Sequence, residues 1–271
     1  MFGIRPLLTE ALRRLANIEQ KLDLLEAGRP AAIAAAVDQG YSGHADQVYG
    51  HYTYAQHGDD LLLLSIFDAL GIAQPSYLDI GAHHPFNISN TALLHQRGSR
   101  GVNVEANPNL IEEFRVQRPQ DINLNCGVSD TVGEMIFYMV DKWSGRNSFD
   151  RDAVERFVSE DPRFRITDEI RIPVITVDEL IGRHCGGRFP DLLSIDVEGL
   201  EGRILRSISY DRWSPKVICA ETCRPGDVGG GDALTRFLSD VGYFPLLKNR
   251  GNSFFVQRTY RRAVTGEPEL P

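Results

Sequence analysis

Residues 76–107, SYLDIGAHHPFNISNTALLHQRGSRGVNVEAN, contain the pattern that decides the fold. The segment begins with the apolar run 76–81 and closes with the apolar run 101–107. Between the two runs, residues 88–98 have helical character and end at Gly98, a residue type common just after the last turn of a helix. Two apolar strands joined through one helix predict neighbouring parallel strands with a right-handed crossover.

The same alternation of helix and strand continues on both sides of this segment. We expect helices over residues 59–71, 108–118, 200–208 and 232–242, and strands over residues 122–130, 134–140, 191–199 and 216–221. Residues 243–249 and 253–258 predict a hairpin around Arg250-Gly251. The fold class is therefore expected to be α/β, with a doubly wound, mostly parallel seven-stranded sheet and a C-terminal antiparallel hairpin. This is the Rossmann-like outline of a class I methyltransferase.

The first 40 residues differ in pattern from the rest of the chain, whose 271 residues suffice for one large domain. Two sets of apolar residues repeat at heptad spacing: Leu8, Leu15 and Leu22, and Ala11, Ile18 and Leu25. The heptads predict a helical extension over residues 1–40 that forms a short coiled coil and a homo-oligomer, although a helix docked on its own domain explains them equally well. We expect residues 41–271 to form the α/β domain, with an insertion at about residues 141–170.

Charge and cysteine content limit the class of protein. Lys and Arg number 29 and Asp and Glu number 37, so the formal net charge is −8, which argues against nonspecific binding of nucleic acid. The four cysteines form no C-x-x-C pair, which predicts reduced thiols in a cytoplasmic protein. Since no apolar run approaches about 18 residues, we expect no membrane span. Charged residues interrupt the N-terminal helix, so we expect no export signal either.

Arginine far outnumbers lysine, which occurs only at positions 21, 142, 216 and 248. Genomic base composition is the simpler explanation of this bias. The alternative is an anionic substrate held by bidentate guanidinium groups.

Acidic residues and a glycine follow the expected strands, at the edge of the sheet where ligands bind in such folds. Asp79 and Gly81 close the first strand, and Glu105 closes the second. A dinucleotide would need G-x-G-x-x-G, but His83 and Phe86 occupy the other glycine positions. S-adenosylmethionine carries no phosphate: Gly81 would suit its methionine end, and Glu105 would accept hydrogen bonds from both ribose hydroxyls. The alternatives are a helix cap for Asp79 and a solvated loop acid for Glu105.

The stretches YLDIGAHHPFNISNTALLHQRGSRGVNVEANPNLIEEF, NLNCGVSD and LLSIDVEGLE together resemble the FkbM family of S-adenosylmethionine-dependent methyltransferases. The upstream AQHGDD resembles the family's lead-in motif, and the resemblance spans roughly residues 50–258. It implies O-methylation of hydroxyl groups, often on sugars. It also implies that Asp79, Gly81 and Glu105 bind the cofactor and that the loop of Val128, Ser129 and Asp130 lies by the adenine. We expect further cofactor contacts from Gln56, Ala82, His83 and Ala106. The chain departs from the commoner family pattern at His83-His84-Pro85, which replaces a smaller, glycine-containing turn.

Methyl transfer to a hydroxyl requires an oriented acceptor oxygen and a base that removes its proton. Asp196 and Glu198 follow an apolar strand, and in an extended segment their side chains would project to one side. Glu221 ends the next strand, so Asp196 and Glu221 are candidate ligands for Mg²⁺, which prefers oxygen. Capping of the helix that starts at Leu200 is the alternative role of these acids.

We expect Asp196, Glu198 and His84 to be the catalytic residues, with His57 and His83 as rival bases. The expected function is an S-adenosylmethionine-dependent O-methyltransferase that acts on a sugar or glycan hydroxyl. A non-catalytic methyltransferase-like scaffold and a methyltransferase for a non-sugar natural product are the alternatives. The absent G-x-G-x-x-G argues against a nucleotide-dependent oxidoreductase, and the absent N-P-P-Y-like motif argues against a nucleic-acid methyltransferase.

Overall fold

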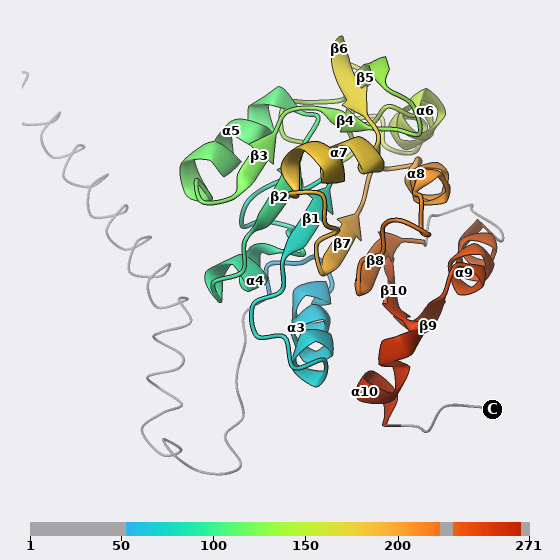
Figure 1. Ribbon diagram of the computed structural model, residues 1–271. Helices are drawn as coiled ribbons and strands as arrows, with labels where there is room; N and C mark the ends of the chain where they lie inside the picture. The colour runs from blue at the N-terminus through green and yellow to red at the C-terminus, as the bar shows by residue number, and fades with distance from the viewer. Residues whose placement is uncertain (1–52, 223–229, 267–271) are drawn as a thin grey trace, which may run out of the picture. The chain divides into compact units, whose positions relative to one another are not determined.

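The computed structural model describes residues 53–222 and 230–266 (Figure 1). Within these residues, a seven-stranded sheet has the order β3-β2-β1-β7-β8-β10-β9. Its strands are β1 (Tyr77–Ile80), β2 (Gly101–Val104), β3 (Ile122–Leu124), β7 (Leu192–Ile195), β8 (Val217–Glu221), β9 (Tyr243–Lys248) and β10 (Asn252–Gln257). The five strands β3, β2, β1, β7 and β8 pair with their neighbours in parallel. Strand β10 pairs antiparallel with both β8 and β9. The doubly wound, mostly parallel sheet with a closing hairpin is confirmed.

Single helices connect most of these strands, as the alternation in the sequence predicts. The helices beside the sheet are α3 (Asp59–Ala69), α4 (Ala92–Gln96), α5 (Pro108–Gln117), α7 (Val177–His184), α8 (Glu201–Ser207) and α9 (Gly230–Asp240). After β10 the chain continues into a 3-10 turn, η1 (Arg258–Tyr260), and a short helix, α10 (Arg261–Thr265), neither of which we expected from the sequence.

Alternate residues of the central strands face two different layers of helices. In β1, Leu78 and Ile80 pack in a core with residues of α7, α8 and α9, whereas Tyr77 packs in a second core with residues of α3 and α4. Strand β8 alternates in the same way, with Ile218 in the first core and Val217 in the second. Figure 1 shows the two groups of helices on opposite sides of the sheet. Burial of both faces explains why the strands appear in the sequence as continuous apolar runs.

Two of the expected elements differ in extent from the sequence-based expectation. The helix expected over residues 88–98 is reduced to α4, because Ile88 has a φ of 52°, outside the right-handed helical region. The strand expected over residues 122–130 divides into β3 and β4 (Gly127–Val128), because Gly127 pairs with Val174 in a separate small sheet.

This small sheet follows directly from the end of β3. It has the order β4-β6-β5, with β5 (Gly133–Met139) antiparallel to β6 (Asp168–Ile175), and α6 (Arg151–Glu160) lies between them in the chain. Since β4 begins shortly after β3 ends, the small sheet lies beyond the carboxyl edge of the main sheet. The predicted insertion at about residues 141–170 covers most of the connection between β5 and β6.

Some expectations concern residues outside the described ranges. The coiled coil over residues 1–40, the homo-oligomer that it would form and the domain start at residue 41 therefore stay predictions. Cys126, Cys185 and Cys219 form no disulfide, as expected, and Cys223 is outside the described residues. No helix within residues 53–222 and 230–266 has the length and apolarity that a membrane span requires.

A buried guanidinium group ties β1 to the starts of α4 and β3. Arg118 is fully buried at the end of α5, and its Nε donates to Asp121 Oδ2 at 2.9 Å. Its Nη2 donates to the Tyr77 hydroxyl at 2.6 Å and to Thr91 Oγ1 at 3.1 Å. The Tyr77 hydroxyl in turn donates to Asp121 Oδ2 at 2.6 Å. Each donor of this network has an acceptor, which a charged group needs when it is buried.

The close pairing of β1 with β2 depends on Gly101. A Cβ atom there would lie 2.2 Å from Cδ2 of the Tyr77 ring and 2.3 Å from the Tyr77 carbonyl oxygen. We predict that Gly101→Ala lowers the free energy of unfolding by about 1–3 kcal/mol, because the buried ring and the strand must move. Urea unfolding measures this change.

Gly182→Ala is the matched control for this prediction. Gly182 is exposed on α7, and an added Cβ would meet no atom within 4 Å. Alanine there should raise the free energy of unfolding by about 0.5–1 kcal/mol through its better helix propensity. A Gly101→Ala protein as stable as the wild type would contradict the packing argument.

Candidate active site

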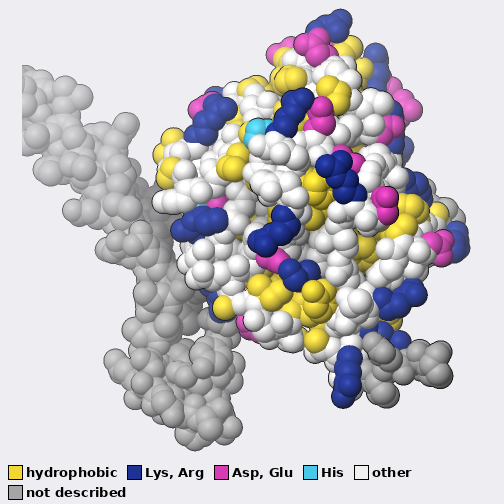
Figure 2. Space-filling model, in the orientation of Figure 1, with side chains coloured by type: hydrophobic (Ala, Val, Ile, Leu, Met, Phe, Trp, Pro, Cys, Tyr) yellow, Lys and Arg dark blue, Asp and Glu magenta, His cyan; other side chains and the backbone are white. Residues whose placement is uncertain are grey.

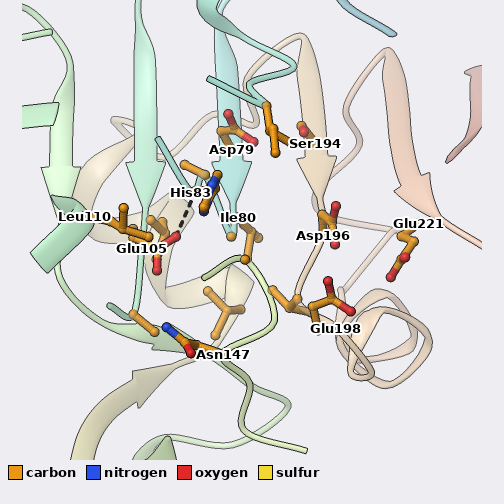
Figure 3. A pocket seen from close by; sticks show the side chains of 18 of the residues that line it. Asp79, Ile80, His83, Glu105, Leu110, Asn147, Ser194, Asp196, Glu198 and Glu221 are labelled. Carbon is orange, nitrogen blue, oxygen red and sulfur yellow. Dashed lines mark hydrogen bonds between the residues drawn. The ribbon is translucent and has the colours of Figure 1, made fainter. Parts of the chain in front are cut away.

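A cavity of about 250 Å³ opens at the carboxyl ends of the central strands (Figure 3). The ends of β1, β2, β7 and β8 line it. Residues 144–147 and Phe149 of the insertion also line it. The expected site residues that line it are Gln56, Asp79, Gly81, Ala82, His83, Glu105, Ala106, Val128, Asp196, Glu198 and Glu221. The structure thus gathers most of the expected cofactor-binding and catalytic residues around one cavity.

The register of the parallel strands explains this gathering. Ile80 pairs with Val104 on one side and with Ile195 on the other. Ile195 pairs in turn with Ala220. The residues that follow these four come next at the same edge of the sheet: Gly81, Glu105, Asp196 and Glu221. Side chains that are far apart in the sequence therefore meet because four strands run in step.

Gly81 makes the closest backbone contact at this edge. Its φ is 75°, and a Cβ atom there would lie 1.8 Å from the carbonyl oxygen of Asp196. Its N–H donates to the carbonyl oxygen of Val104 at 2.9 Å. Because both the left-handed φ and the contact exclude a side chain, the glycine is required by the fold as well as by any ligand.

Glu105 is held by the two turns that flank it. Its carboxylate accepts the N–H of His83 at 2.8 Å, drawn as a dashed line in Figure 3, and the N–H of Asn107 at 2.7 Å. Burial raises the pKa of Glu105 to about 7, although these two backbone donors oppose the shift. The solvated loop acid is therefore wrong as a description of Glu105, which is 6 % exposed.

Asp79 is also buried, and Thr91 Oγ1 donates to its Oδ2 at 2.6 Å. Burial raises the pKa of Asp79, while the hydrogen bond from Thr91 and the charge of Arg118 act against this rise. Thr91 is the residue before α4, so Asp79 secures the start of that helix through a side chain. Asp79 is not a helix cap itself, because it accepts the Thr91 hydroxyl and no backbone N–H of α4, and it lines the cavity.

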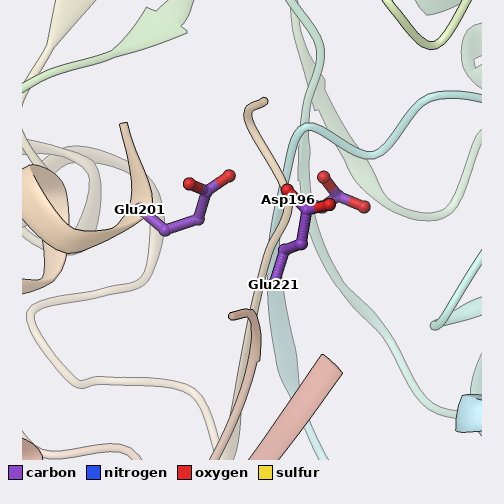
Figure 4. Close-up of side chains that lie close together, drawn as sticks. All are labelled: Asp196, Glu201 and Glu221. Atoms are coloured by element: carbon purple, nitrogen blue, oxygen red, sulfur yellow. The ribbon is translucent and has the colours of Figure 1, made fainter. Parts of the chain in front are cut away.

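Three carboxylates lie close together, as Figure 4 shows. Asp196, Glu201 and Glu221 each offer an oxygen within 4.8 Å of the others. Asp196 and Glu221 are the expected metal ligands, and Glu201 was not expected. Glu201 is buried at the start of α8, and its Oε1 accepts the N–H of Val197 at 2.8 Å. Its position in the first turn of a helix is a sequence feature by which it could have been found.

Glu198 reaches the cavity in a different way from the one expected. Strand β7 ends at Ile195, and Glu198 has a φ of 53°, so residues 196–198 are not one extended segment. The Glu198 carboxylate faces Arg146 of the insertion at 3.4 Å, and its carbonyl oxygen accepts the hydroxyl of Ser148 at 3.1 Å. Glu198 therefore joins the main sheet to the insertion.

Three expected site residues and the rival base His57 are not part of the cavity lining. His84 Nδ1 accepts the N–H of Phe86 at 3.1 Å, and burial lowers the pKa of His84. Asp130 pairs with Arg203 at 2.7 Å, and Ser129 donates to Asp130 at 3.1 Å. The rival base His83 does line the cavity, and burial lowers its pKa, which favours the neutral imidazole that a base requires.

Sequence reasoning missed several polar residues on the far side of the cavity. Asp59 lines it and is 1 % exposed, accepting side-chain amides from Asn249 at 3.0 Å and Asn252 at 3.2 Å. Asn90 also lines it and donates to Ser194 Oγ at 3.4 Å. The contacts of Asp59 join the first turn of α3 to the β9–β10 hairpin. The contact of Asn90 joins the loop before α4 to β7. Asp59 lies in the quoted AQHGDD motif, which was the one available indication.

Left-handed backbone is concentrated around this cavity. Among the described residues other than glycine, positive φ angles occur at His83, Ile88 and Glu198, with values of 56°, 52° and 53°. All three line the cavity. Such conformations cost about 1–3 kcal/mol each and are typical of functional sites.

The arginine excess does not serve this cavity. Among the described residues that line it, Arg146 is the sole Arg or Lys, whereas acids stand at positions 59, 79, 105, 196, 198 and 221. Figure 2 shows Lys and Arg side chains dispersed over the visible face. The lining therefore does not support an anionic substrate held by several guanidinium groups in this cavity.

The strand order, with one antiparallel strand between β8 and β9, and a cavity at the carboxyl ends define the class I methyltransferase fold. The family model described as the methyltransferase FkbM domain matches residues 79–245, so the chain belongs to this family. The family that the sequence motifs indicated is thus confirmed. No curated protein matches the chain.

Three solved structures are similar to the chain at low identity. The methyltransferase FkbM from Methylobacillus flagellatus KT is 14 % identical with a TM-score of 0.38, over 68 % of this chain and 44 % of that one. Cofactor-bound Rv0187 from MTB is 18 % identical with a TM-score of 0.39, over 89 % and 96 %. Monomeric WbdD is 14 % identical with a TM-score of 0.35, over 81 % and 44 %. The chain thus spans less than half of the first and third structures.

The raised pKa of Glu105 leads to a prediction about stability. The unfolded chain releases this proton near the ordinary value of 4.5, whereas the folded chain keeps it to about 7. Stability from this group is therefore present at low pH and is lost as the pH rises through about 7, by up to roughly 3 kcal/mol. Urea unfolding as a function of pH measures the loss. The Glu105→Gln protein should lack this component, and identical pH dependence in both proteins would contradict the assignment.

Proposed function

We propose that the chain is an S-adenosylmethionine-dependent O-methyltransferase that acts on a hydroxyl group of a sugar or glycan. The observation that carries the proposal is the meeting of Gly81 and Glu105 with Asp196 and Glu221 around one cavity. The first two residues suit the cofactor, and the last two suit the acceptor. The cytoplasmic location stays a prediction.

The charge of the cavity supports this cofactor. Six carboxylates and one guanidinium group line it among the described residues, so a positive sulfonium is favoured and a pyrophosphate is disfavoured. Glu105 would accept hydrogen bonds from the two ribose hydroxyls. Leu110, Val128 and Phe137 line the cavity and provide apolar surface for an adenine ring.

Further hydrogen-bonding residues line the cavity beside the strand-end acids. Asp59, Asn90, Ser194 and Asn252 line it, and carboxylate, amide and hydroxyl groups are the partners that sugar hydroxyls require. This supports a polyhydroxylated acceptor over an apolar natural product.

Proton removal from the acceptor falls to Glu198 or His83 in this proposal. Both line the cavity, and a base must lie within hydrogen-bond reach of the hydroxyl. His84 is the weaker candidate because it is not part of the lining. Asp196 would orient the acceptor oxygen.

The carboxylates of Asp196 and Glu221 also fit a divalent ion. Oxygen ligands in this number suit Mg²⁺ better than zinc, and Glu201 is already engaged by a backbone N–H. A Mg²⁺ ion held there would lower the pKa of the acceptor hydroxyl.

The cofactor half is tested by calorimetry with S-adenosylhomocysteine. We predict that Glu105→Ala weakens its binding by about 1–3 kcal/mol, because the hydrogen bonds from the ribose hydroxyls to the carboxyl group are lost. Glu112→Ala is the control, since Glu112 is exposed on α5 and pairs with Arg115. Equal affinity of the Glu105→Ala and wild-type proteins would remove Glu105 from the ribose site.

The acceptor half is tested by metal removal. We predict that EDTA abolishes methyl transfer to a glycoside and that Mg²⁺ restores it. Asp196→Asn should lose both turnover and the response to Mg²⁺ while its affinity for S-adenosylhomocysteine stays near that of the wild type. Asp68→Asn, on the exposed side of α3, should retain both. Full activity in excess EDTA would exclude the metal and leave Glu198 or His83 to act alone.

A further inference from the structure

The hydroxyl of Thr91 lies between a group that can only donate and one that accepts. Arg118 Nη2 donates to Thr91 Oγ1 at 3.1 Å, and Thr91 Oγ1 donates to Asp79 Oδ2 at 2.6 Å. A guanidinium group has no acceptor, so the single proton of Thr91 must point toward Asp79. All three side chains are buried, Asp79 at 4 % exposure and the other two at 0 %.

We propose that Thr91 and Arg118 are positioning residues for the cofactor, which fix Asp79 Oδ2 as a hydrogen-bond acceptor and hold the carboxylate ready for the ammonium group of S-adenosylmethionine. The inference rests on the proposed function, because it takes that cofactor as the ligand. Neither residue lines the cavity, so both act through Asp79.

The charges of the network support this role. Arg118 forms an ion pair with Asp121 at 2.9 Å, and both side chains are fully buried. The positive charge of Arg118 is thus balanced by Asp121, and the charge of Asp79 has no equal partner within the network. A ligand with a positive group at the cavity end of Asp79 supplies that partner.

Several other groups also influence Asp79. Burial and the charge of Asp121 raise its pKa, whereas Thr91, Arg118 and Ser194 lower it. The charge of Asp79 in turn raises the pKa of two groups on neighbouring strands, Glu105 at the end of β2 and Cys219 in β8. His95 of α4 lies 3.1 Å from Asp121, and burial lowers its pKa. A comparison of variants at position 91 leaves these groups in place, so that they cancel.

The test is calorimetry of S-adenosylhomocysteine binding as a function of pH, for the wild type, Thr91→Val and Thr91→Ser. Valine keeps the shape and removes the donor, and serine keeps the donor. An ammonium ligand needs ionised Asp79, so affinity is lost as the pH falls through the pKa of Asp79. Without the Thr91 donor that pKa is higher. We expect Thr91→Val to bind about tenfold more weakly than the wild type, and the acidic limb of its affinity–pH curve to lie at higher pH. We expect Thr91→Ser to match the wild type in both respects.

A merely structural Thr91 would give a different result. Thr91→Val would then lose the same factor of affinity at every pH, or none, and either result overturns the proposal. A displaced acidic limb in Thr91→Ser also overturns it. If Thr91→Val does not fold, Arg118→Lys serves in its place, because it keeps the charge with fewer donors and must displace the limb in the same direction. If the wild type does not bind S-adenosylhomocysteine, the proposed function fails. If the wild type binds it and all variants lose affinity at the same pH, only the role of Thr91 and Arg118 fails.

Discussion

The functional arrangement of this chain depends on the hydrogen-bonded register of four parallel strands. Ile80 is in step with Val104 and Ile195, and Ile195 with Ala220, so that the strands end together. A slip of one residue would turn each side chain to the opposite face and would separate the acids from one another. The apolar cores on both faces hold the register, since each admits only one of the two alternating sets of side chains.

The sequence was sufficient to predict the sheet and the strand-end residues, because both follow from local pattern. Asp79, Gly81 and Glu105 each come at the end of an apolar run, and such ends coincide in a parallel sheet. Asp59 could not be placed in the same way, because its contact with Asn252 joins positions that lie far apart in the chain.

Backbone conformation accounts for the remaining differences. Glu198 was expected to project alongside Asp196, but its left-handed φ turns the chain away from the strand direction. Ile88 shortens the expected helix for the same reason. A β-branched residue gives no indication of a positive φ in the sequence, so such positions depend on tertiary contacts that only the folded chain reveals.

The carbonyl oxygen of Asp196 lies where a Cβ atom on Gly81 would be, so the turn after β1 and the turn after β7 meet backbone to backbone. The turn that would meet the cofactor and the turn that would meet the acceptor are therefore adjacent layers of backbone. If occupancy of one half displaces its turn, the other turn is displaced as well, and the two ligands become thermodynamically linked. Linkage of this kind is reciprocal: the factor by which the cofactor changes the affinity for the acceptor equals the factor by which the acceptor changes the affinity for the cofactor.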